Sequence, residues 1–267
     1  MNVSGGGSLS HFKNKDLTPF LFWSKVFKGI LVEWTMRFKV YDEVFEKLPD
    51  LCFGVAVGYH INNKQNIPEI YELMKNEMSK VENNLKGINL KEYQGIIPYR
   101  DAFNKLNLNP NKFMSSVEAM VKRVSKGNVL PSINPVVDLG NSISLKYILP
   151  MGAHDLDALE GEIAVRFSRQ GDTFTSLGEE VVEVLDSGEL VYADSKKIRT
   201  RRWIWRQSNI GKIDENSKNI FFPIDGFQTN KERVLKAADE LEILLKKYFN
   251  CKTKKGFLDI NNQEMEI

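Results

Sequence analysis

The chain has 267 residues, and its 37 Lys and Arg residues nearly balance its 35 Asp and Glu residues, which leaves a formal net charge of +2. This balance excludes a histone-like polycation and an acidic solubilising tail, so any nucleic-acid-binding surface must be local. The two cysteines, Cys52 and Cys251, lie far apart, which excludes a disulfide framework and a four-cysteine zinc site and favours a reducing, cytoplasmic compartment.

Residues 1–35 differ from the rest of the chain, because a Ser/Gly-rich start is followed by aromatic and aliphatic residues at helical spacing. An amphipathic helix, on a membrane surface or against the body, is one interpretation. Another interpretation is that the native protein starts at Met36 and that the preceding residues are a translated leader. We therefore treat residues 1–35 as an N-terminal extension that is either native or non-native, and either ordered or disordered. No apolar run approaches the ~18 residues of a membrane span, so integral membrane contact is not expected.

The first part of the body is expected to be mainly helical. Residues 36–58 predict a strand, a short helical turn and a second, buried strand. Apolar residues recur at helical spacing over 67–85, which predicts an amphipathic helix. Two shorter helices are expected at 99–106 and 115–126, the second capped by serine. This pair is more typical of a packing unit than of a DNA-reading motif, because its basic residues gather at one helix end.

Strands concentrate in the second part of the body. A largely buried helix is expected at 136–149 and a strand at 163–167. Further short strands, separated by turn signals, are expected at 181–185, 190–192, 198–205 and 220–224. A helix over 231–248 closes the body, and residues 251–267 are expected to form a mobile, Lys-rich tail. The order of elements predicts one α+β domain over 36–250, with mixed or antiparallel sheets and flanking helices.

The chain lacks the common motifs of nucleotide and metal chemistry. It contains no phosphate-binding loop, no dinucleotide fingerprint and no nucleophile elbow. No two of its three histidines have the i, i+4 spacing that places two imidazoles on one helical face. We therefore expect neither a metal nor another cofactor.

One candidate group lies on the predicted buried helix and the turn that follows it. Its members are Asp138, Asn141, His154, Asp155 and Asp157. Asp138 and Asn141 share a helical face, and a histidine beside two carboxylates can titrate near neutrality and act as a general base or orient a water. The alternative is that Asp and Asn residues at such positions only cap helices and satisfy loop amides.

A second candidate group is the segment KKIRTRRWIWRQ, residues 196–207. As one strand, this segment would place Arg202 and Arg206 on one face and the alternate residues on the other, namely Arg199, Arg201, Trp203, Trp205 and Gln207. Cations interleaved with tryptophans suit a single-stranded RNA end, because guanidinium groups hold phosphates and indoles stack on bases. The alternative is a solvated edge strand with Arg–Trp stacking.

The segment PVVDLGNSISLKYILPMGAHDLDALEGEIAVR, residues 135–166, resembles the B3/B4 domain of the bacterial phenylalanyl-tRNA synthetase beta subunit. In that domain a Pro-Val-Val-Asp-x-x-Asn helix precedes Pro-Met-His-Ala-Phe-Asp-Leu-Asp and a strand. The later GDTF and GELVYAD stretches fit the same domain. The whole chain resembles the free-standing B3/B4 proteins, which lack the synthetase catalytic core.

The resemblance implies an editing site, because the synthetase domain hydrolyses tyrosine mischarged onto phenylalanine tRNA. Asn141 matches an editing-site asparagine. The editing histidine falls on Gly152, and His154 stands two residues later, where the domain has phenylalanine. The editing glutamate belongs to a loop whose counterpart here is Arg206-Gln207-Ser208, which contains no glutamate.

The residues and the resemblance together predict a protein that recognises the aminoacylated acceptor end of tRNA and hydrolyses an incorrect aminoacyl ester. We expect Asn141, His154 and Gln207 to line the ester, and neutral donors to suffice for orienting a water. We expect RNA or substrate binding, without DNA, by Asp138, Asp155, Arg199, Arg201, Trp203, Trp205 and Arg206. The alternative is a non-catalytic module that binds an amino acid, a nucleoside or RNA in the same pocket.

Overall fold

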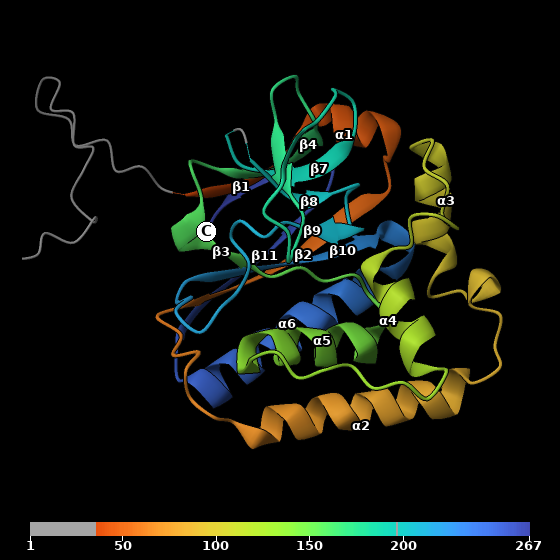
Figure 1. Ribbon diagram of the computed structural model, residues 1–267, viewed down its shortest axis with the longest axis vertical. Helices are drawn as coiled ribbons and strands as arrows, with labels where there is room; N and C mark the ends of the chain where they lie inside the picture. Colours follow the sequence, from red (N-terminus) through yellow and green to blue (C-terminus); the bar gives the residue numbers. More distant parts are fainter. Residues whose placement is uncertain (1–35, 196) are drawn as a thin grey trace, which may run out of the picture. The chain divides into compact units, whose positions relative to one another are not determined.

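Two packed β-sheets, one of them covered by helices, make up the architecture of the computed structural model, which describes residues 36–195 and 197–267 (Figure 1). The larger sheet has six strands in the order β12-β1-β4-β7-β8-β9, of which only β1 and β4 run parallel. Its strands are β1 (Arg37–Val40), β4 (Ile163–Phe167), β7 (Leu190–Ala193), β8 (Ile198–Arg201), β9 (Arg206–Gln207) and β12 (Glu264–Glu266).

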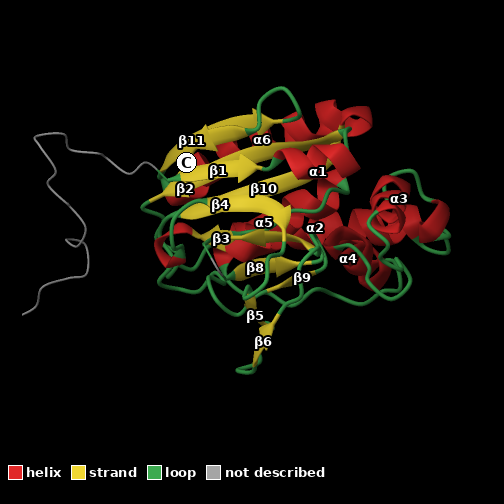
Figure 2. Cartoon of the chain, turned by 90° about the horizontal axis from the view of Figure 1, so that it is seen from above, coloured by secondary structure: helices red, strands yellow, loops and turns green. Residues whose placement is uncertain are grey.

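The second sheet is antiparallel, with the order β11-β2-β10-β3. Its strands are β2 (Leu51–Tyr59), β3 (His154–Asp155), β10 (Ile220–Phe227) and β11 (Lys252–Leu258). A separate hairpin pairs β5 (Thr173–Thr175) with β6 (Val182–Val184) and projects from the body (Figure 2). The combination of mixed and antiparallel sheets with helices confirms the predicted α+β class.

The helices gather mainly on one side of the four-stranded sheet, where α6 packs on β2, β10 and β11, and α5 and α2 lie successively farther away (Figure 1). The α-helices are α1 (Asp42–Lys47), α2 (Pro68–Leu85), α3 (Ile97–Lys105), α4 (Ser116–Val124), α5 (Pro135–Tyr147) and α6 (Lys231–Phe249). Three short 3₁₀ helices are η1 (Leu90–Glu92), η2 (Leu156–Ala158) and η3 (Gln228–Asn230).

Local sequence explains where these helices begin. Ser115 Oγ accepts a hydrogen bond from Glu118 N at the start of α4, and Asn134 Oδ1 accepts one from Val137 N at the start of α5, where Pro135 occupies the first turn. The apolar stripe of α2 is buried, as its helical spacing predicts.

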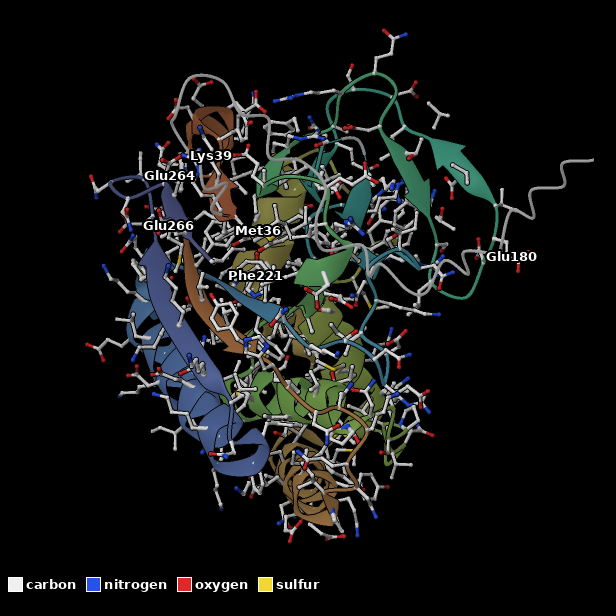
Figure 3. All side chains as sticks on the ribbon, turned by 90° about the vertical axis from the view of Figure 1, so that its left-hand side faces the viewer. Met36, Lys39, Glu180, Phe221, Glu264 and Glu266 are labelled. Atoms are coloured by element: carbon white, nitrogen blue, oxygen red, sulfur yellow. The ribbon has the colours of Figure 1, made fainter. Side chains whose placement is uncertain are left out.

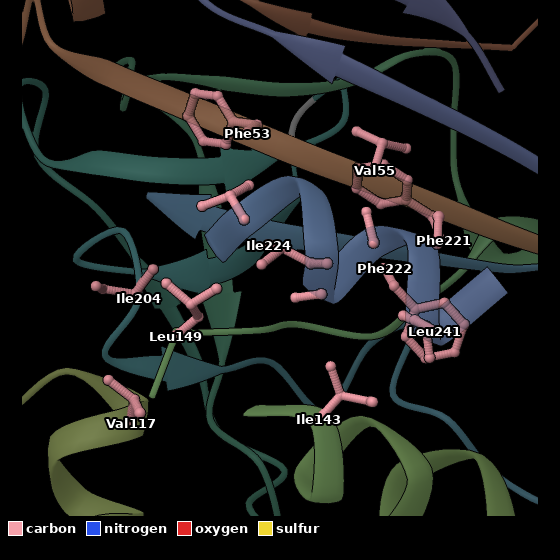
Figure 4. Close-up of a cluster of buried hydrophobic side chains, with 14 of the residues drawn as sticks. Phe53, Val55, Val117, Ile143, Leu149, Ile204, Phe221, Phe222, Ile224 and Leu241 are labelled. Carbon is pink, nitrogen blue, oxygen red and sulfur yellow. The ribbon is translucent and has the colours of Figure 1, made fainter. Parts of the chain in front are cut away.

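The core lies between the two sheets and under the helices. The Phe38 ring on β1 packs 5.7 Å from the Phe53 ring and 4.8 Å from the Phe221 ring, between centroids, which joins the sheets face to face. In Figure 3, Phe221 lies centrally, whereas Glu180 and Glu264 lie toward opposite edges of that view. Figure 4 shows Phe222 of β10 beside Leu241 of α6, with Ile143 of α5 farther from the sheet, whereas Phe53 and Val55 of β2 lie on the opposite side of their strand.

Two sequence predictions about strands are wrong. Residues 251–267 are not a mobile tail, because β11 pairs with β2 along its length, β12 pairs with β1, and both belong to one compact unit over 36–267. The strand expected over 198–205 ends at Arg201, and a turn then returns the chain antiparallel as β9. Residues 1–35, set apart as an N-terminal extension, lie outside the described residues.

A buried carboxylate joins the sheets to this turn. Asp225 Oδ1 on β10 accepts hydrogen bonds from Tyr192 Oη at 2.8 Å and from Trp203 Nε1 at 2.6 Å, and its carbonyl oxygen accepts one from Tyr99 Oη at 3.0 Å. Burial raises the pKa of the Asp225 carboxyl from 3.8 to about 7, because removal from water penalises the charged form more than the two donors favour it.

This shifted pKa gives a testable pH dependence. Because the folded chain holds the Asp225 proton more tightly than the unfolded chain, its contribution to stability is full below pH 3.8 and is lost as the pH rises through about 7. We expect the free energy of unfolding of the wild type, relative to Asp225→Asn, to fall over that window in urea titrations. Identical pH profiles for the two proteins would contradict this.

Candidate functional site

Three segments distant in sequence meet at the loop of residues 151–153, between α5 and β3. A β-carbon placed on Gly140 of α5 would lie 3.8 Å from Met151 Sδ, so the helix and the loop are in van der Waals contact. Gly152 N donates to Pro223 O on β10 at 3.1 Å, and Gln207 Nε2 on β9 donates to Ala153 O at 2.8 Å. These contacts hold the loop against α5, β10 and β9.

Asn141 and Gln207 are neutral hydrogen-bonding residues on two of the elements that contact this loop, α5 and β9. Asn141 follows Gly140 on α5 and is half-buried, and its carboxamide has no hydrogen-bond partner among residues 36–195 and 197–267. Gln207 is also half-buried, and one of its two amide hydrogens is held by Ala153 O. A second N–H and the carbonyl oxygen of Gln207 remain available, so both predicted residues can donate to or accept from a ligand.

His154, which sequence analysis assigned to the ester, lies in the core behind Gly152, where an added β-carbon would come within 3.1 Å of the imidazole Nε2. Its side chain is 2% exposed and stacks between Tyr192 and Phe221, with ring centroids 5.6 and 6.1 Å away. Burial, assisted by the nearby Arg199 charge, lowers the pKa of the imidazole from 6.5 to about 3. The ring is therefore neutral at physiological pH and shielded from a ligand.

The depressed pKa of His154 predicts an acid-sensitive contribution to stability. Because the unfolded chain binds this proton more tightly, the contribution is full above pH 6.5 and is lost as the pH falls toward about 3. His154→Phe keeps an aromatic ring but does not titrate, so wild type should lose stability relative to the variant on acidification. Denaturant titrations between pH 7 and 4 measure the difference, and a constant difference would refute the prediction.

The three predicted aspartates hold loops and turns. Asp138 is 2% exposed, and its carboxylate accepts hydrogen bonds from Ser132 Oγ and, at 2.9 Å, from Ile133 N ahead of α5. Asp155 accepts from Asp157 N at 3.0 Å and from Ser217 Oγ at 2.7 Å, and burial raises the pKa of its carboxyl. These hydrogen bonds agree with the alternative considered, that the carboxylates satisfy local groups, and substrate binding by Asp138 and Asp155 stays a prediction.

The prediction of one cationic, aromatic strand face over 196–207 is also wrong. Arg199 is 1% exposed, and its guanidinium pairs with Asp194 and donates to Ala158 O. Trp203 is completely buried and bonded to Asp225, because the turn after β8 points its indole inward. Neither side chain can reach RNA from these positions. Lys196, the first residue of the segment, lies outside the described residues.

Arg201 is only partly exposed and is neutralised. Its Nε donates to Glu189 at 2.9 Å, and its Nη1 lies 2.7 Å from a Glu183 oxygen. Two carboxylates on one guanidinium leave little net charge for a phosphate. The prediction that Arg201 holds phosphate is therefore not supported by its surroundings.

The turn after β8 presents a different cationic and aromatic group beside Gln207, which we call the Arg–Trp cluster: Phe113, Arg202, Trp205 and Arg206. The Arg202 guanidinium carbon lies 4.1 Å from the Phe113 ring centroid and 4.6 Å from that of Trp205, and the Arg206 guanidinium lies 5.0 Å from Trp205. Arg206 is exposed and Trp205 is half-buried. Arg202 is only partly exposed and pairs with Glu189 Oε2 at 3.5 Å, so the cluster offers the Arg206 cation and part of the Trp205 indole at the surface.

Sequence analysis included Trp205 and Arg206 but missed two members of this cluster. Arg202 was assigned to the opposite strand face, and its φ of +48° shows that the chain has already left the strand there. Phe113 comes from the loop before α4 and packs edge-on to Trp205 at 5.0 Å. No local pattern connects positions 113 and 205, so only the tertiary contact identifies Phe113.

The described residues contain no group of three or more His, Cys, Asp or Glu side chains placed to hold a metal ion. Within the same residues, no helix combines the length and apolarity needed to cross a membrane. The chemistry available at residues 141, 151–153 and 207 is therefore that of carboxamides and backbone groups, with the Arg–Trp cluster alongside.

Comparison with known proteins places this chain. A family described as the B3/4 domain matches residues 98–252, which is more than half of the chain and includes Asn141, the 151–153 loop, β8 and β9. The chain belongs to the B3/4 domain family. The resemblance drawn from residues 135–166 is confirmed.

Relatives of this B3/4 domain protein are phenylalanine–tRNA ligase beta subunits. That of Fusobacterium nucleatum is 32% identical over 209 residues, covering 75% of this chain and 24% of the relative. That of Idiomarina loihiensis is 46% identical over 90 residues, covering 34% of this chain and 11% of the relative. The matches thus span about a quarter or less of these relatives.

Among solved structures, an N-terminal fragment of the phenylalanyl-tRNA synthetase beta subunit from Pyrococcus horikoshii matches with a TM-score of 0.42 and 11% identity, covering 81% of this chain and 50% of the fragment.

Proposed function

We propose that this B3/4 protein recognises the aminoacylated acceptor end of tRNA and hydrolyses an incorrect aminoacyl ester in trans. The observation that carries the proposal is that the 151–153 loop contacts both Gly140, the neighbour of Asn141 on α5, and Gln207, which lies beside the Arg–Trp cluster. The family relationship supports it, because the relatives are subunits of an enzyme that joins phenylalanine to tRNA. Carboxamides face the ester in this proposal, and the cations and indole face the RNA.

The Arg–Trp cluster suits the terminal nucleotides of tRNA. The exposed Arg206 guanidinium can pair with a phosphate while Trp205 offers part of its indole to a base. Base stacking on an aromatic ring contributes about 1–3 kcal/mol per base and tolerates any sequence. A terminal adenosine bound there would bring its ribose ester toward Gln207, the residue after Arg206.

Hydrolysis at this site would proceed without a protein base. Water adds to the ester carbonyl carbon, the bond from that carbon to the ribose oxygen breaks, and the ribose oxygen takes up the proton, which leaves a free amino acid and a free ribose hydroxyl. Asn141 and the second N–H of Gln207 would stabilise the oxyanion, and the neighbouring ribose hydroxyl would relay the proton. Because Ala153 O holds the first N–H of Gln207, the carboxamide is oriented in advance.

A second candidate function is binding of the acceptor end without cleavage. It is favoured by the position of His154, which is buried with a depressed pKa, and by Gly152, which carries no side chain where the family has its editing histidine. Retention of Asn141 and of the oriented Gln207 carboxamide favours hydrolysis. A direct assay of ester release separates the two functions.

The assay is release of amino acid from a panel of correctly and incorrectly charged tRNAs. We expect selective hydrolysis by the wild type and a loss of about 10²-fold or more in Asn141→Ala, because one oxyanion donor contributes about that factor. Affinity for uncharged tRNA should be unchanged, since Asn141 faces the ester.

The matched control is Asn84→Ala, an exposed asparagine on α2 that should retain full activity. Equal turnover in Asn141→Ala would remove the site assignment. No release from any charged tRNA would leave binding without cleavage as the function.

The Arg–Trp cluster gives a separate prediction about affinity. Arg206→Ala should weaken tRNA binding and reduce the slope of log affinity against log salt by about one unit, because it removes one phosphate contact. Trp205→Ala should weaken binding with little change in that slope, since stacking releases no counterions. Fluorescence anisotropy over a range of salt concentrations that starts at ~50 mM measures the tRNA affinity and its salt dependence. Equal slopes in wild type and Arg206→Ala would contradict the phosphate contact.

A further inference from the structure

A hollow lies between α3 and the loop of residues 107–111. Its volume is about 460 Å³. The face of α3 contributes residues at helical spacing, and the loop closes the opposite wall. Polar side chains dominate its lining, namely Lys91, Asp101, Asn104, Asn107, Asn109 and Asn111.

The polar groups of this amide-lined cavity are largely free to bind a ligand. The Arg100 guanidinium is fixed as one wall, because it donates to Glu118 at 2.6 Å and to Asn111 Oδ1 at 2.8 Å. Asn109 Oδ1 is also occupied, by Asn111 N at 2.9 Å. The carboxamide hydrogens of Asn109 and Asn111 are left over as donors.

Three further side chains of the cavity make no hydrogen bond or ion pair within residues 36–195 and 197–267: Lys91, Asp101 and Asn104. Asp101 and Asn104 lie one helical turn apart on α3, so their oxygens can receive the amino group of a base together. Lys91 comes from η1 and adds a point charge suited to a phosphate.

The charge around the cavity favours a polyanion. Residues 86–126 contain eight Lys and Arg against three Asp and Glu, a net charge of +5 in a chain whose total is +2. The remaining residues therefore sum to −3. This asymmetry concentrates positive charge on α3, α4 and the segments that flank them, where it attracts nucleic acid locally.

The cavity adjoins another hollow, which borders the Arg–Trp cluster. Leu108 lines it and also lines a neighbouring hollow that reaches Phe113 and Arg202. Phe113 in turn packs on Trp205. A strand leaving Gln207 over Trp205 and Phe113 would therefore arrive at the amide-lined cavity.

We infer that the amide-lined cavity binds one unpaired nucleotide of the same RNA, with the amino group of its base at Asp101 and Asn104 and its phosphate at Lys91. This inference rests on the proposed function, which brings an RNA end to Gln207. Carboxamides match the edges of bases with paired donors and acceptors, and proteins read unpaired RNA through such edges. The apolar floor formed by Ile97 and Leu108 can support the face of the base.

The test measures binding of the full chain to uncharged tRNA and to an eight-nucleotide single-stranded RNA by fluorescence anisotropy. Lys91→Glu and Asn104→Leu change exposed side chains, so the fold should be retained. We expect each to raise the Kd for both RNAs about tenfold, as loss of one good base or phosphate contact does. Matched controls are Lys236→Glu on α6 and Asn84→Leu on α2, both exposed, which should bind like wild type.

The outcomes separate this inference from the proposed function. If Lys91→Glu and Asn104→Leu both bind RNA with the Kd of the wild type, the cavity assignment is overturned and the ester site is unaffected. Weaker RNA binding in both variants supports the cavity even if no charged tRNA is hydrolysed. AMP is titrated in parallel: if the two variants lose AMP binding while their RNA affinity is unchanged, the cavity takes a free nucleotide and the RNA contact is wrong.

Discussion

The buried carboxylate of Asp225 is the constraint on which the site depends. It accepts hydrogen bonds from Tyr192 of the six-stranded sheet and from Trp203 in the turn after β8. The backbone carbonyl oxygen of Asp225 accepts one from Tyr99 of α3. Arg202 and Trp203 both have positive φ, at +48° and +59°, a costly conformation for side chains of this size. Anchoring the indole at Asp225 holds this turn closed, and the closed turn sets Trp205, Arg206 and Gln207 at the sheet edge.

The same packing decides which polar residues can act on a ligand. His154 stacks between Tyr192 and Phe221, so the imidazole belongs to the joint between the sheets and stays uncharged. Arg199 is likewise buried against Asp194, where a charge is tolerated because it is paired. The loop of residues 151–153 contacts Gln207 and α5 at Gly140, and the half-buried carboxamides of Gln207 and Asn141 need no ionisation to bind a carbonyl or an oxyanion.

The regular elements follow closely from local sequence. The spacing of apolar residues in α2, α5 and α6 and the caps at Ser115 and Asn134 depend on neighbours within one or two turns, and the helices lie where that pattern predicts. Strand alternation was less informative. The residue pattern over 198–205 fits one continuous strand, yet the chain bends after Arg201, because Trp203 is buried against Asp225. Nothing within the segment itself predicts this bend.

The sequence by itself determined the α+β class, the position of the long helices and, through residues 135–166, the B3/4 family. Only the tertiary structure decided that His154, Arg199 and Trp203 are core, that β11 and β12 complete the sheets, and that Phe113 joins Trp205. The physical reason is that helical periodicity and capping arise from contacts close in sequence. Burial, pairing of charges and the closing of a sheet edge depend on residues 30 to 200 positions away, as in the Tyr192–Asp225 and β2–β11 contacts.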